Sequence, residues 1–267
     1  MPTAGRFRYL EAAPSPHAPR VRGTLVLLHG FPLTARMWEP QLVLAEQGWR
    51  VIAPQLRGFD GADHDLPASS IDDFAGDVID LLDRLHIHEA VIGGLSMGGY
   101  VALAMFRHAP RYFQGLVLAD TRADADAPAT IEGRQRLLAV VRERGAAGVA
   151  EDMLPKLLGA TTRVERPEIV ERVRSLVLAS SPAAISGAIS ALMTRSDSTP
   201  LLERIHCPTL ILVGDEDTVT PRPLSEALQA GIAGSTLASV PLAGHLSNME
   251  QPGVFNDTVA RFLEQKM

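Results

Sequence analysis

The stretch Gly93-Gly94-Leu95-Ser96-Met97-Gly98-Gly99 constrains the fold more than any other part of this 267-residue sequence. A serine stands between glycines two positions before and two positions after it, with an apolar run ahead and a helical pattern behind. This spacing predicts a strand, a tight turn and a helix, with Ser96 at the apex in a strained backbone conformation. A side chain at Gly94 or Gly98 would collide with the neighbouring element. The motif alone also fits an ordinary glycine-rich turn, so the rest of the chain has to decide.

Continuous apolar runs alternate with helical patterns along most of the chain. The runs expected to form buried parallel strands are residues 24–28, 50–54, 90–92, 115–119, 209–213 and 236–240, and residues 6–11 are expected to form a short alternating strand. The clearest helical pattern begins at Ser70, which with Asp73 has the spacing of a capping box. This alternation predicts an α/β fold, with a mostly parallel sheet of about eight strands and helices on both faces.

The alternation is interrupted between residues 122 and 199. No strong strand is expected there, only helical segments at about residues 130–144, 148–158, 167–179 and 182–194. An all-helical segment inside an alternating sheet is typical of a lid or cap. The expected organisation is therefore one interrupted domain, with core residues 1–121, a helical cap insertion at 122–199 and core residues 200–267.

Composition excludes several classes of protein. The charge of −6, from 25 basic and 31 acidic residues without a Lys/Arg run, argues against nucleic-acid and anionic-membrane partners. No apolar run approaches the ~20 residues that span a bilayer. The single cysteine, Cys207, cannot form an internal disulfide, and residues 1–10 lack the apolar core of a signal peptide. We therefore expect a cytoplasmic globular protein with a small-molecule partner, its oligomeric state left open.

Three strand ends carry side chains that can form one catalytic site. Ligands of an open parallel sheet bind beyond the carboxyl ends of its strands, where Ser96, Asp217 and His245 are expected. Their order along the chain suits a nucleophile turn served by later strands. In acyl-bond hydrolysis the serine attacks as an imidazole takes its proton, while a buried carboxylate orients the imidazole. Asp120 is the alternative carboxylate. It stands at the end of residues 115–119, the strand expected after the helix that follows Ser96.

Acyl transfer also needs two backbone N–H donors for the oxyanion. The residue after the nucleophile supplies one, which is Met97, and the loop after an early strand supplies the other, for which Phe31 is the candidate. The same side of the sheet offers Leu33, Trp38 and Leu246 as possible substrate-binding residues, although each also fits a core position.

No metal or organic cofactor is implied. His86, His88 and Glu89 are close in sequence, but no further ligands lie in a matching motif, and solvation at a helix end accounts for them. His29 is expected to support the loop after the early strand rather than to transfer protons. Four arginines of the insertion could pair with a substrate carboxylate or could lie on solvated faces: Arg134, Arg136, Arg163 and Arg195.

The chain resembles proteins of the α/β-hydrolase fold from about residue 6 to residue 266. Four motifs stand in that family's order and approximate spacing: Leu27-Leu28-His29-Gly30-Phe31-Pro32, Gly94-Leu95-Ser96-Met97-Gly98-Gly99, Gly214-Asp215-Glu216-Asp217-Thr218-Val219-Thr220-Pro221 and Ala243-Gly244-His245. The resemblance implies the α/β-hydrolase fold and a serine, aspartate and histidine triad. Within this family, the compact helical cap and the glycine-framed turn around Ser96 are similar to those of the carboxylesterase and 3-oxoadipate enol-lactonase group.

One loop departs from the pattern common in such proteins. Many relatives have Asp-x-Arg-Gly-x-Gly after the second buried strand, whereas this chain has Gln55 in place of the Asp and Asp60 where a Gly is usual. The loop takes no part in triad chemistry, so the departure concerns the shape of the chain near the pocket.

These observations favour a serine hydrolase that cleaves a carboxylic ester or lactone through an acyl-enzyme. A cofactor-free haloperoxidase or perhydrolase, or a C–C bond hydrolase, would use the same residues. An alternative of another class is a non-catalytic receptor for a small ligand on this fold. A haloalkane dehalogenase is disfavoured, because its nucleophile would be an Asp where Ser96 stands. The insertion, which would select the substrate, carries no interpretable charge signature.

Overall fold

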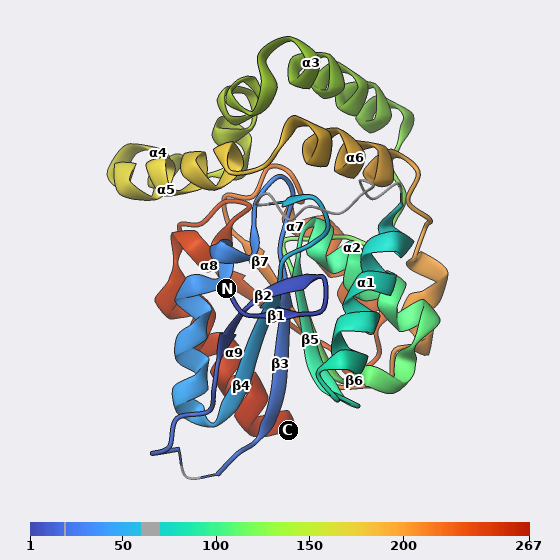
Figure 1. Ribbon diagram of the computed structural model, residues 1–267, viewed down its shortest axis with the longest axis vertical. Helices are drawn as coiled ribbons and strands as arrows, with labels where there is room; N and C mark the ends of the chain where they lie inside the picture. The colour runs from blue at the N-terminus through green and yellow to red at the C-terminus, as the bar shows by residue number, and fades with distance from the viewer. Residues whose placement is uncertain (19, 60–69) are drawn as a thin grey trace.

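The computed structural model describes residues 1–18, 20–59 and 70–267, and its centre is an eight-stranded sheet (Figure 1). The strands are β1 (Thr3–Ala4), β2 (Phe7–Ala12), β3 (Gly23–Leu28), β4 (Trp49–Pro54), β5 (Ala90–Leu95), β6 (Phe113–Ala119), β7 (Thr209–Gly214) and β8 (Thr236–Val240). Their order across the sheet is β1-β2-β4-β3-β5-β6-β7-β8. The pairs β1–β2 and β2–β4 are antiparallel, and all other pairs are parallel. The mostly parallel sheet expected from the sequence is confirmed.

Helices cover both faces of this sheet. In the core they are η1 (Ala35–Gln47), α1 (Ile71–Arg84), α2 (Met97–His108), α7 (Arg222–Gly231), α8 (Ser247–Glu250) and α9 (Pro252–Lys266), with short turns η3 (Pro110–Tyr112) and η4 (Thr199–Arg204). Figure 1 shows α1 and α2 on one side of the sheet and η1 and α9 on the other. Every residue of β5 and β7 is buried, because helices cover both faces of the central strands.

Helix α1 begins where the sequence predicts. The Ser70 hydroxyl accepts a 3.0 Å hydrogen bond from the Asp73 N–H, and the Asp73 carboxylate accepts one of 2.9 Å from the Ser70 N–H. This reciprocal capping satisfies two amides that the helix itself leaves unbonded. Phe74, Val78 and Leu81 are buried, so the apolar face of α1 packs into the core as its periodicity indicates.

Segment η1 is not a regular α-helix. It is mainly a 3₁₀ helix with Pro40 inside it, and Gly48 ends it with a φ of 92°. Proline has no N–H and clashes with the preceding turn, so a regular α-helix is not favoured there. The left-handed conformation at Gly48 suits a residue without a Cβ.

Four helices occupy the chain between β6 and β7, two strands that are neighbours in the sheet. They are α3 (Pro128–Leu157), α4 (Ala160–Glu165), α5 (Pro167–Leu178) and α6 (Pro182–Met193), and together we call them the insertion. In Figure 1 the insertion lies across one end of the sheet. Helix α3 is kinked at Gly145, where φ is 60° and ψ is −156°. The kink divides it where the sequence predicts two separate helices.

Within the described residues no helix by itself is long and apolar enough to cross a bilayer. Helices α5 and α6 reach the required length and hydropathy only as a pair, and that pair is bent by 92°. Both helices bury apolar side chains inside the protein, Val173 and Val177 from α5 and Ile185 and Ile189 from α6 among them.

The parallel strands end at one edge of the sheet, and the chain leaves each of them there in a loop. The residues that follow β3, β5, β6 and β7 are His29, Ser96, Asp120 and Asp215, and β8 is followed by the turn that leads to His245. Because parallel strands share one direction, these loops converge although they are far apart in sequence. The fold therefore gathers the predicted site residues at this edge.

Candidate active site

Ser96 lies at the apex of a tight turn between β5 and α2. Its φ of 53° and ψ of −116° are uncommon for a residue other than glycine, and its own N–H donates a 3.0 Å hydrogen bond to the Ala119 carbonyl. A Cβ at Gly94 would lie 2.2 Å from the Gly98 carbonyl oxygen, and one at Gly98 would lie 2.0 Å from that of Leu28. The two glycines are therefore required by close packing, as the sequence motif indicates.

Ser96, His245 and Asp217 form a continuous chain of hydrogen bonds. The His245 Nε2 lies 2.8 Å from the Ser96 Oγ, and the His245 Nδ1 lies 2.9 Å from the Asp217 Oδ2. His245 and Asp217 are buried, whereas Ser96 is half-buried. An imidazole placed between a hydroxyl and a buried carboxylate can take the hydroxyl proton, while the carboxylate fixes its tautomer.

Asp217 is held by its own loop. One carboxylate oxygen accepts hydrogen bonds of 2.8 Å from the Val219 N–H and 3.0 Å from the Thr220 N–H, and the other accepts one of 2.6 Å from the Thr220 hydroxyl. Burial alone would raise the pKa of Asp217, but His245 and these donors outweigh it and lower the pKa to about 2. Sequence analysis overlooked Thr220, although an Asp bonded to amides two and three residues later is a recognisable turn pattern.

Asp120 occupies a different position, in contact with Gly214 and Ser247, which border the loops of the predicted triad residues Asp217 and His245. Its carboxylate accepts a 2.8 Å hydrogen bond from the Gly214 N–H and one of 2.5 Å from the Ser247 hydroxyl. Burial and the charge of Asp217 raise the pKa of Asp120 to about 8. In the described part of the chain it has no hydrogen bond to His245, so Asp217 and Asp120 differ clearly in geometry.

The imidazole of His245 is buried. Burial lowers its pKa, but the charge and hydrogen bond of Asp217 act against burial and raise the pKa above the ordinary value of 6.5. The backbone N–H of His245 donates a 3.1 Å hydrogen bond to the carbonyl of Leu157, at the end of α3. The insertion therefore contacts the histidine directly.

The loop after β3 lies against the serine turn. A Cβ at Gly30 would be 3.5 Å from the Ser96 Cβ, so Phe31, the next residue, starts close to the nucleophile. Met97 is the first residue of helix α2, so its N–H has no acceptor within the helix. Across residues 1–18, 20–59 and 70–267, neither the Phe31 N–H nor the Met97 N–H has a hydrogen-bond acceptor in the protein. Both amides are thus available to a ligand beside Ser96.

His29 and Gln55 hold this loop in place. The His29 Nδ1 lies 3.1 Å from the Gly30 carbonyl, and its Nε2 accepts a 3.1 Å hydrogen bond from the Leu56 N–H. Burial lowers the pKa of His29 to about 4, so the ring is neutral and structural. Gln55 accepts a 3.0 Å hydrogen bond from the Ala35 N–H, and its amide nitrogen lies 3.4 Å from His29 Nε2. Gln55 therefore helps to hold the loop after β3 in place. Asp60, the other departure from the common pattern, lies outside the described residues.

Leu33, Trp38 and Leu246 are all buried, with exposed fractions of 0%, 1% and 1%. Trp38 packs against Phe255 with 6.0 Å between ring centroids, a contact between η1 and α9. Such low exposure is typical of core residues. A substrate-binding role for the three side chains stays a prediction.

Two of the four arginines considered as carboxylate ligands are occupied by Asp126. Arg134 and Arg195 both pair with its carboxylate, and the Arg195 guanidinium also lies 4.3 Å from the centre of the Tyr100 ring. Burial raises the pKa of Asp126, but the two arginines outweigh burial and lower it. Arg136 and Arg163 are the exposed members of the set.

No group of three or more His, Cys, Asp or Glu side chains is arranged to hold a metal ion in the described residues. His86, His88 and Glu89 are exposed beyond the end of α1. Cys207 is half-buried, and burial raises the pKa of its thiol, which disfavours the reactive thiolate.

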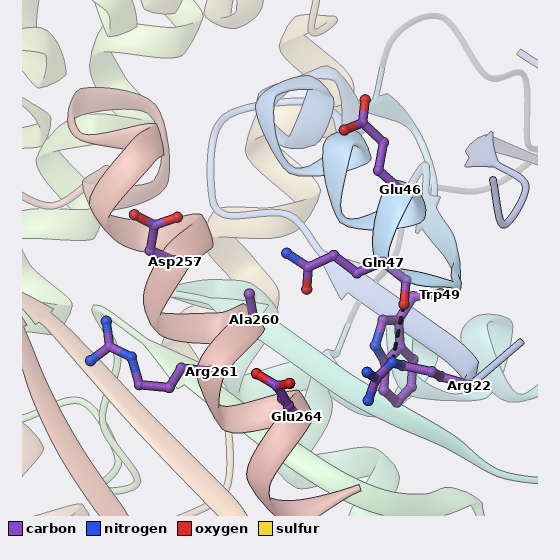
Figure 2. Close-up of a pocket in the computed structure, with 8 residues that line it drawn as sticks. All are labelled: Arg22, Glu46, Gln47, Trp49, Asp257, Ala260, Arg261 and Glu264. Atoms are coloured by element: carbon purple, nitrogen blue, oxygen red, sulfur yellow. Dashed lines mark hydrogen bonds between the residues drawn. The ribbon is translucent and has the colours of Figure 1, made fainter. Parts of the chain in front are cut away.

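A surface pocket of about 500 Å³ lies away from the triad, between α9 and the start of β4 (Figure 2). Its lining residues are Arg22, Glu46, Gln47, Trp49, Asp257, Ala260, Arg261 and Glu264. Trp49 opens β4, so this pocket is at the amino ends of the parallel strands, opposite the edge that carries Ser96. Figure 2 shows acidic and basic side chains together around it. The Arg22 Nε donates a 3.1 Å hydrogen bond to the Gln47 carbonyl, and no Ser, Thr or Cys is among the described lining residues.

Comparison with known proteins places the chain among hydrolases. Residues 25–258 match the model of the alpha/beta hydrolase family. A 3-oxoadipate enol-lactonase of Acinetobacter baylyi is 30% identical over 244 residues, which cover 91% of this chain and 90% of the lactonase. These matches confirm the resemblance inferred from the four sequence motifs.

Solved structures give the same result. A thermophilic esterase from Thermogutta terrifontis, solved with malate bound, superposes with a TM-score of 0.89 at 35% identity, covering 97% of this chain and 93% of the esterase. The enol-lactonase from Burkholderia xenovorans superposes with a TM-score of 0.86 at 25% identity, covering 97% and 96%. The chain is thus similar over nearly its whole length to enzymes that open ester or lactone bonds.

Proposed function

Because the chain belongs to the alpha/beta hydrolase family, we propose that it is a serine hydrolase that cleaves a carboxylic ester or lactone through an acyl-enzyme. The observation that carries this proposal is the hydrogen-bond chain from Ser96 through His245 to Asp217. The similarity to an esterase and to two enol-lactonases supports the same class of substrate.

The three hydrogen-bonded residues have distinct roles in this reaction. The Ser96 Oγ attacks the substrate carbonyl as its proton passes to His245 Nε2, and the imidazolium then gives that proton to the departing alcohol oxygen. Water next attacks the acyl-serine, again with His245 as the base, which releases the carboxylic acid and restores the serine. Asp217 holds the imidazole in the required tautomer and stabilises its charge.

The oxyanion of the tetrahedral intermediate would be bound by the Phe31 and Met97 amides. Two features support this assignment: both amides lack an acceptor within the described protein, and the loop of Phe31 packs against the serine turn. The Met97 N–H also belongs to the first turn of α2, where the helix dipole favours negative charge. His29 and Gln55 would position this loop without touching the substrate.

An acyl group without a carboxylate suits the site best. All arginines of the segment 122–199 that are buried or half-buried have protein partners: Arg122, Arg134, Arg166, Arg174 and Arg195. A dicarboxylic lactone would need a cation that is not already paired. We therefore expect a higher kcat/KM for neutral short-chain esters than for a carboxylated enol-lactone, measured side by side. The reverse preference would contradict the substrate class but leave the serine mechanism standing.

The decisive experiment replaces Ser96 by Ala. Without the nucleophile, kcat for a short p-nitrophenyl ester should fall by about 10⁴- to 10⁶-fold. Ester turnover that survives this substitution would overturn the serine mechanism. Steady release of product by the wild type, beyond one equivalent per protein, would exclude a receptor that only binds the ligand. Peroxide added to the same assay tests the perhydrolase alternative.

The pH dependence of the wild type gives a second test. His245 must be neutral to act as the base, and its pKa is raised by Asp217. The acid limb of the kcat/KM profile should therefore have its midpoint above pH 6.5, with activity rising as pH increases through it. A midpoint near the pKa of an ordinary carboxylate would mean that His245 is not the titrating base.

A further inference from the structure

One turn of the insertion is bonded to the loop that carries His245. This turn comprises residues 157–161, from the last residue of α3 to the second residue of α4. The Leu157 carbonyl accepts a 3.1 Å hydrogen bond from the His245 N–H. Two residues later, the Gly159 N–H donates a 2.8 Å hydrogen bond to the carboxylate of Glu250, at the end of α8.

Glu250 also bonds to both neighbours of His245. Its other carboxylate oxygen accepts 2.9 Å from the Gly244 N–H and 3.1 Å from the Leu246 N–H. The Glu250 side chain is fully buried, with an exposed fraction of 0%. A buried carboxylate that accepts three backbone N–H groups is satisfied in this geometry, and a group with fewer acceptors would leave a buried donor unpaired.

The same turn is bonded to the loop of Asp217. Glu216, the residue before the triad carboxylate, accepts hydrogen bonds of 2.9 Å from the Thr161 N–H and 2.5 Å from the Thr161 hydroxyl. The Glu216 N–H in turn donates a 2.8 Å hydrogen bond to the Ala243 carbonyl, just before His245. One turn of the insertion therefore links the two loops that position the base and its carboxylate.

Two glycines allow this close approach. A Cβ at Gly159 would lie 2.4 Å from Glu216 Oε2 and 2.8 Å from the Gly244 nitrogen, and a Cβ at Gly244 would lie 2.3 Å from the Gly159 nitrogen. Neither position has room for a side chain. By contrast, a Cβ at Gly133 in α3 would meet nothing closer than an Arg136 nitrogen at 3.8 Å.

We propose that Glu250 is a positioning residue that locks the turn of residues 157–161 to the His245 loop, so that this part of the insertion and the catalytic histidine move as one unit. The proposal rests on the proposed function for its kinetic consequences. In this proposal the turn serves catalysis, and substrate selection is left to the other helices of the insertion. Loss of the lock should therefore change kcat more than KM.

Glu250→Gln is the most direct test, because the amide has nearly the same shape but only one oxygen acceptor. Its NH₂ group must face at least one of the three backbone donors. We expect kcat to fall by about 10- to 100-fold while KM stays within about threefold, since a small displacement of a catalytic group has effects of this size. Glu250 also contributes to the raised pKa of His245, so the acid limb of kcat/KM should move to lower pH. An unchanged kcat and an unchanged acid limb would overturn the proposal.

Gly159→Ala tests the turn from the side of the insertion, and Gly133→Ala is its matched control. The first variant should lower kcat in the same way as Glu250→Gln, whereas the second should keep kcat and KM within twofold of the wild type. If Glu250→Gln does not fold, as judged by circular dichroism, this pair decides by the same measurements. Equal kinetics for the two alanine variants would overturn the proposal.

Amide hydrogen exchange tests the lock without any turnover. In a Ser96→Ala background, Glu250→Gln should make at least one of the Gly159, Gly244 and Leu246 amides exchange at least tenfold faster, while amides of β5 keep their protection. This result would support the lock even if the wild type showed no ester hydrolysis, so failure of the proposed function and failure of the lock can be told apart. Unchanged exchange at all three amides would refute the lock.

Discussion

The sheet core and the insertion are stabilised in different ways. Strands β5 and β7 are buried along their whole length, whereas α3, with 30 residues, buries only six of them: Val141, Gly148, Val149, Ala150, Leu154 and Leu157. Most of the free energy of the core comes from apolar burial on both faces of the sheet. The insertion exposes much more of its surface, and polar contacts join it to the core in addition to apolar packing such as that of Ile185 and Ile189 in α6.

Some of these polar contacts lie where the chain enters and leaves the insertion and at its turn of residues 157–161, and others join Arg172 to Glu39 and the Ser180 hydroxyl to the Pro32 carbonyl. At the entry and exit, the Ser198 N–H donates a 2.9 Å hydrogen bond to the Ala123 carbonyl, and Arg195 pairs with Asp126. From the core, Arg107 of α2 donates a 2.8 Å hydrogen bond to the Ser198 hydroxyl. The comparison teaches that the predicted triad and the attachment at the entry and exit of the insertion depend on separate polar groups, which substitutions can separate, whereas the turn of residues 157–161 is shared by both.

The largest effect is expected for Asp217→Asn, which acts on the core side of this comparison. The amide would allow the wrong His245 tautomer, so kcat should fall by about 10⁴-fold in ester hydrolysis. Asp120→Asn keeps an acceptor for the Gly214 N–H and alters only the hydrogen bonds that hold the neighbouring loops. We therefore expect kcat to fall by about 10- to 100-fold in this variant. Kinetics of the two variants that rank in the opposite order would make Asp120 the triad carboxylate.

A large effect on stability is expected for Asp126→Ala, on the insertion side. The substitution leaves the buried Arg195 guanidinium without its counter-charge, which should lower the free energy of unfolding by about 3–5 kcal/mol in urea titrations. Asp124→Ala is the matched control at the same entry segment, because its half-exposed carboxylate lies 3.6 Å from Arg122 and should contribute less than about 1 kcal/mol. Equal losses in the two variants would show that burial of the pair does not matter.

The smallest effects are expected at the exposed arginines of the insertion. Arg136→Ala and Arg163→Ala remove side chains from exposed positions, so the free energy of unfolding should change by less than about 0.5 kcal/mol. KM for a neutral ester should also stay the same in both variants. A selective rise in KM for a carboxylated ester would show that one of these arginines binds a substrate carboxylate. The insertion would then contribute directly to substrate binding.

Part of the candidate site could be predicted because local sequence dictates it. Gly94 and Gly98 are required around Ser96 by contacts of about 2 Å that any Cβ would make, so the motif and the turn imply each other. The capping box at Ser70 is equally local. Thr220 was within reach of the same reasoning, since its bonds to Asp217 span only three residues.

Other contacts could not be predicted, because they join segments that only the folded chain brings together. Gln55 accepts its hydrogen bond from the Ala35 amide, 20 residues earlier, and Glu250 accepts one from the Gly159 amide, 91 residues earlier. The alternatives Asp217 and Asp120 both follow parallel strands in the sequence. Their geometry differs only because the loop after β8 turns the His245 imidazole towards one carboxylate and Ser247 towards the other.

The sequence by itself determined the alternating sheet, the serine turn and the three strand ends that carry the predicted triad residues. Apolar runs, glycine spacing and capping residues encode these features through interactions within a few residues or through burial on a regular period. Only the tertiary structure decided which carboxylate faces His245, which arginines are occupied by Asp126 and where the insertion meets the catalytic loops. Those outcomes depend on hydrogen bonds and ion pairs between distant segments, whose geometry exists only after the chain has packed.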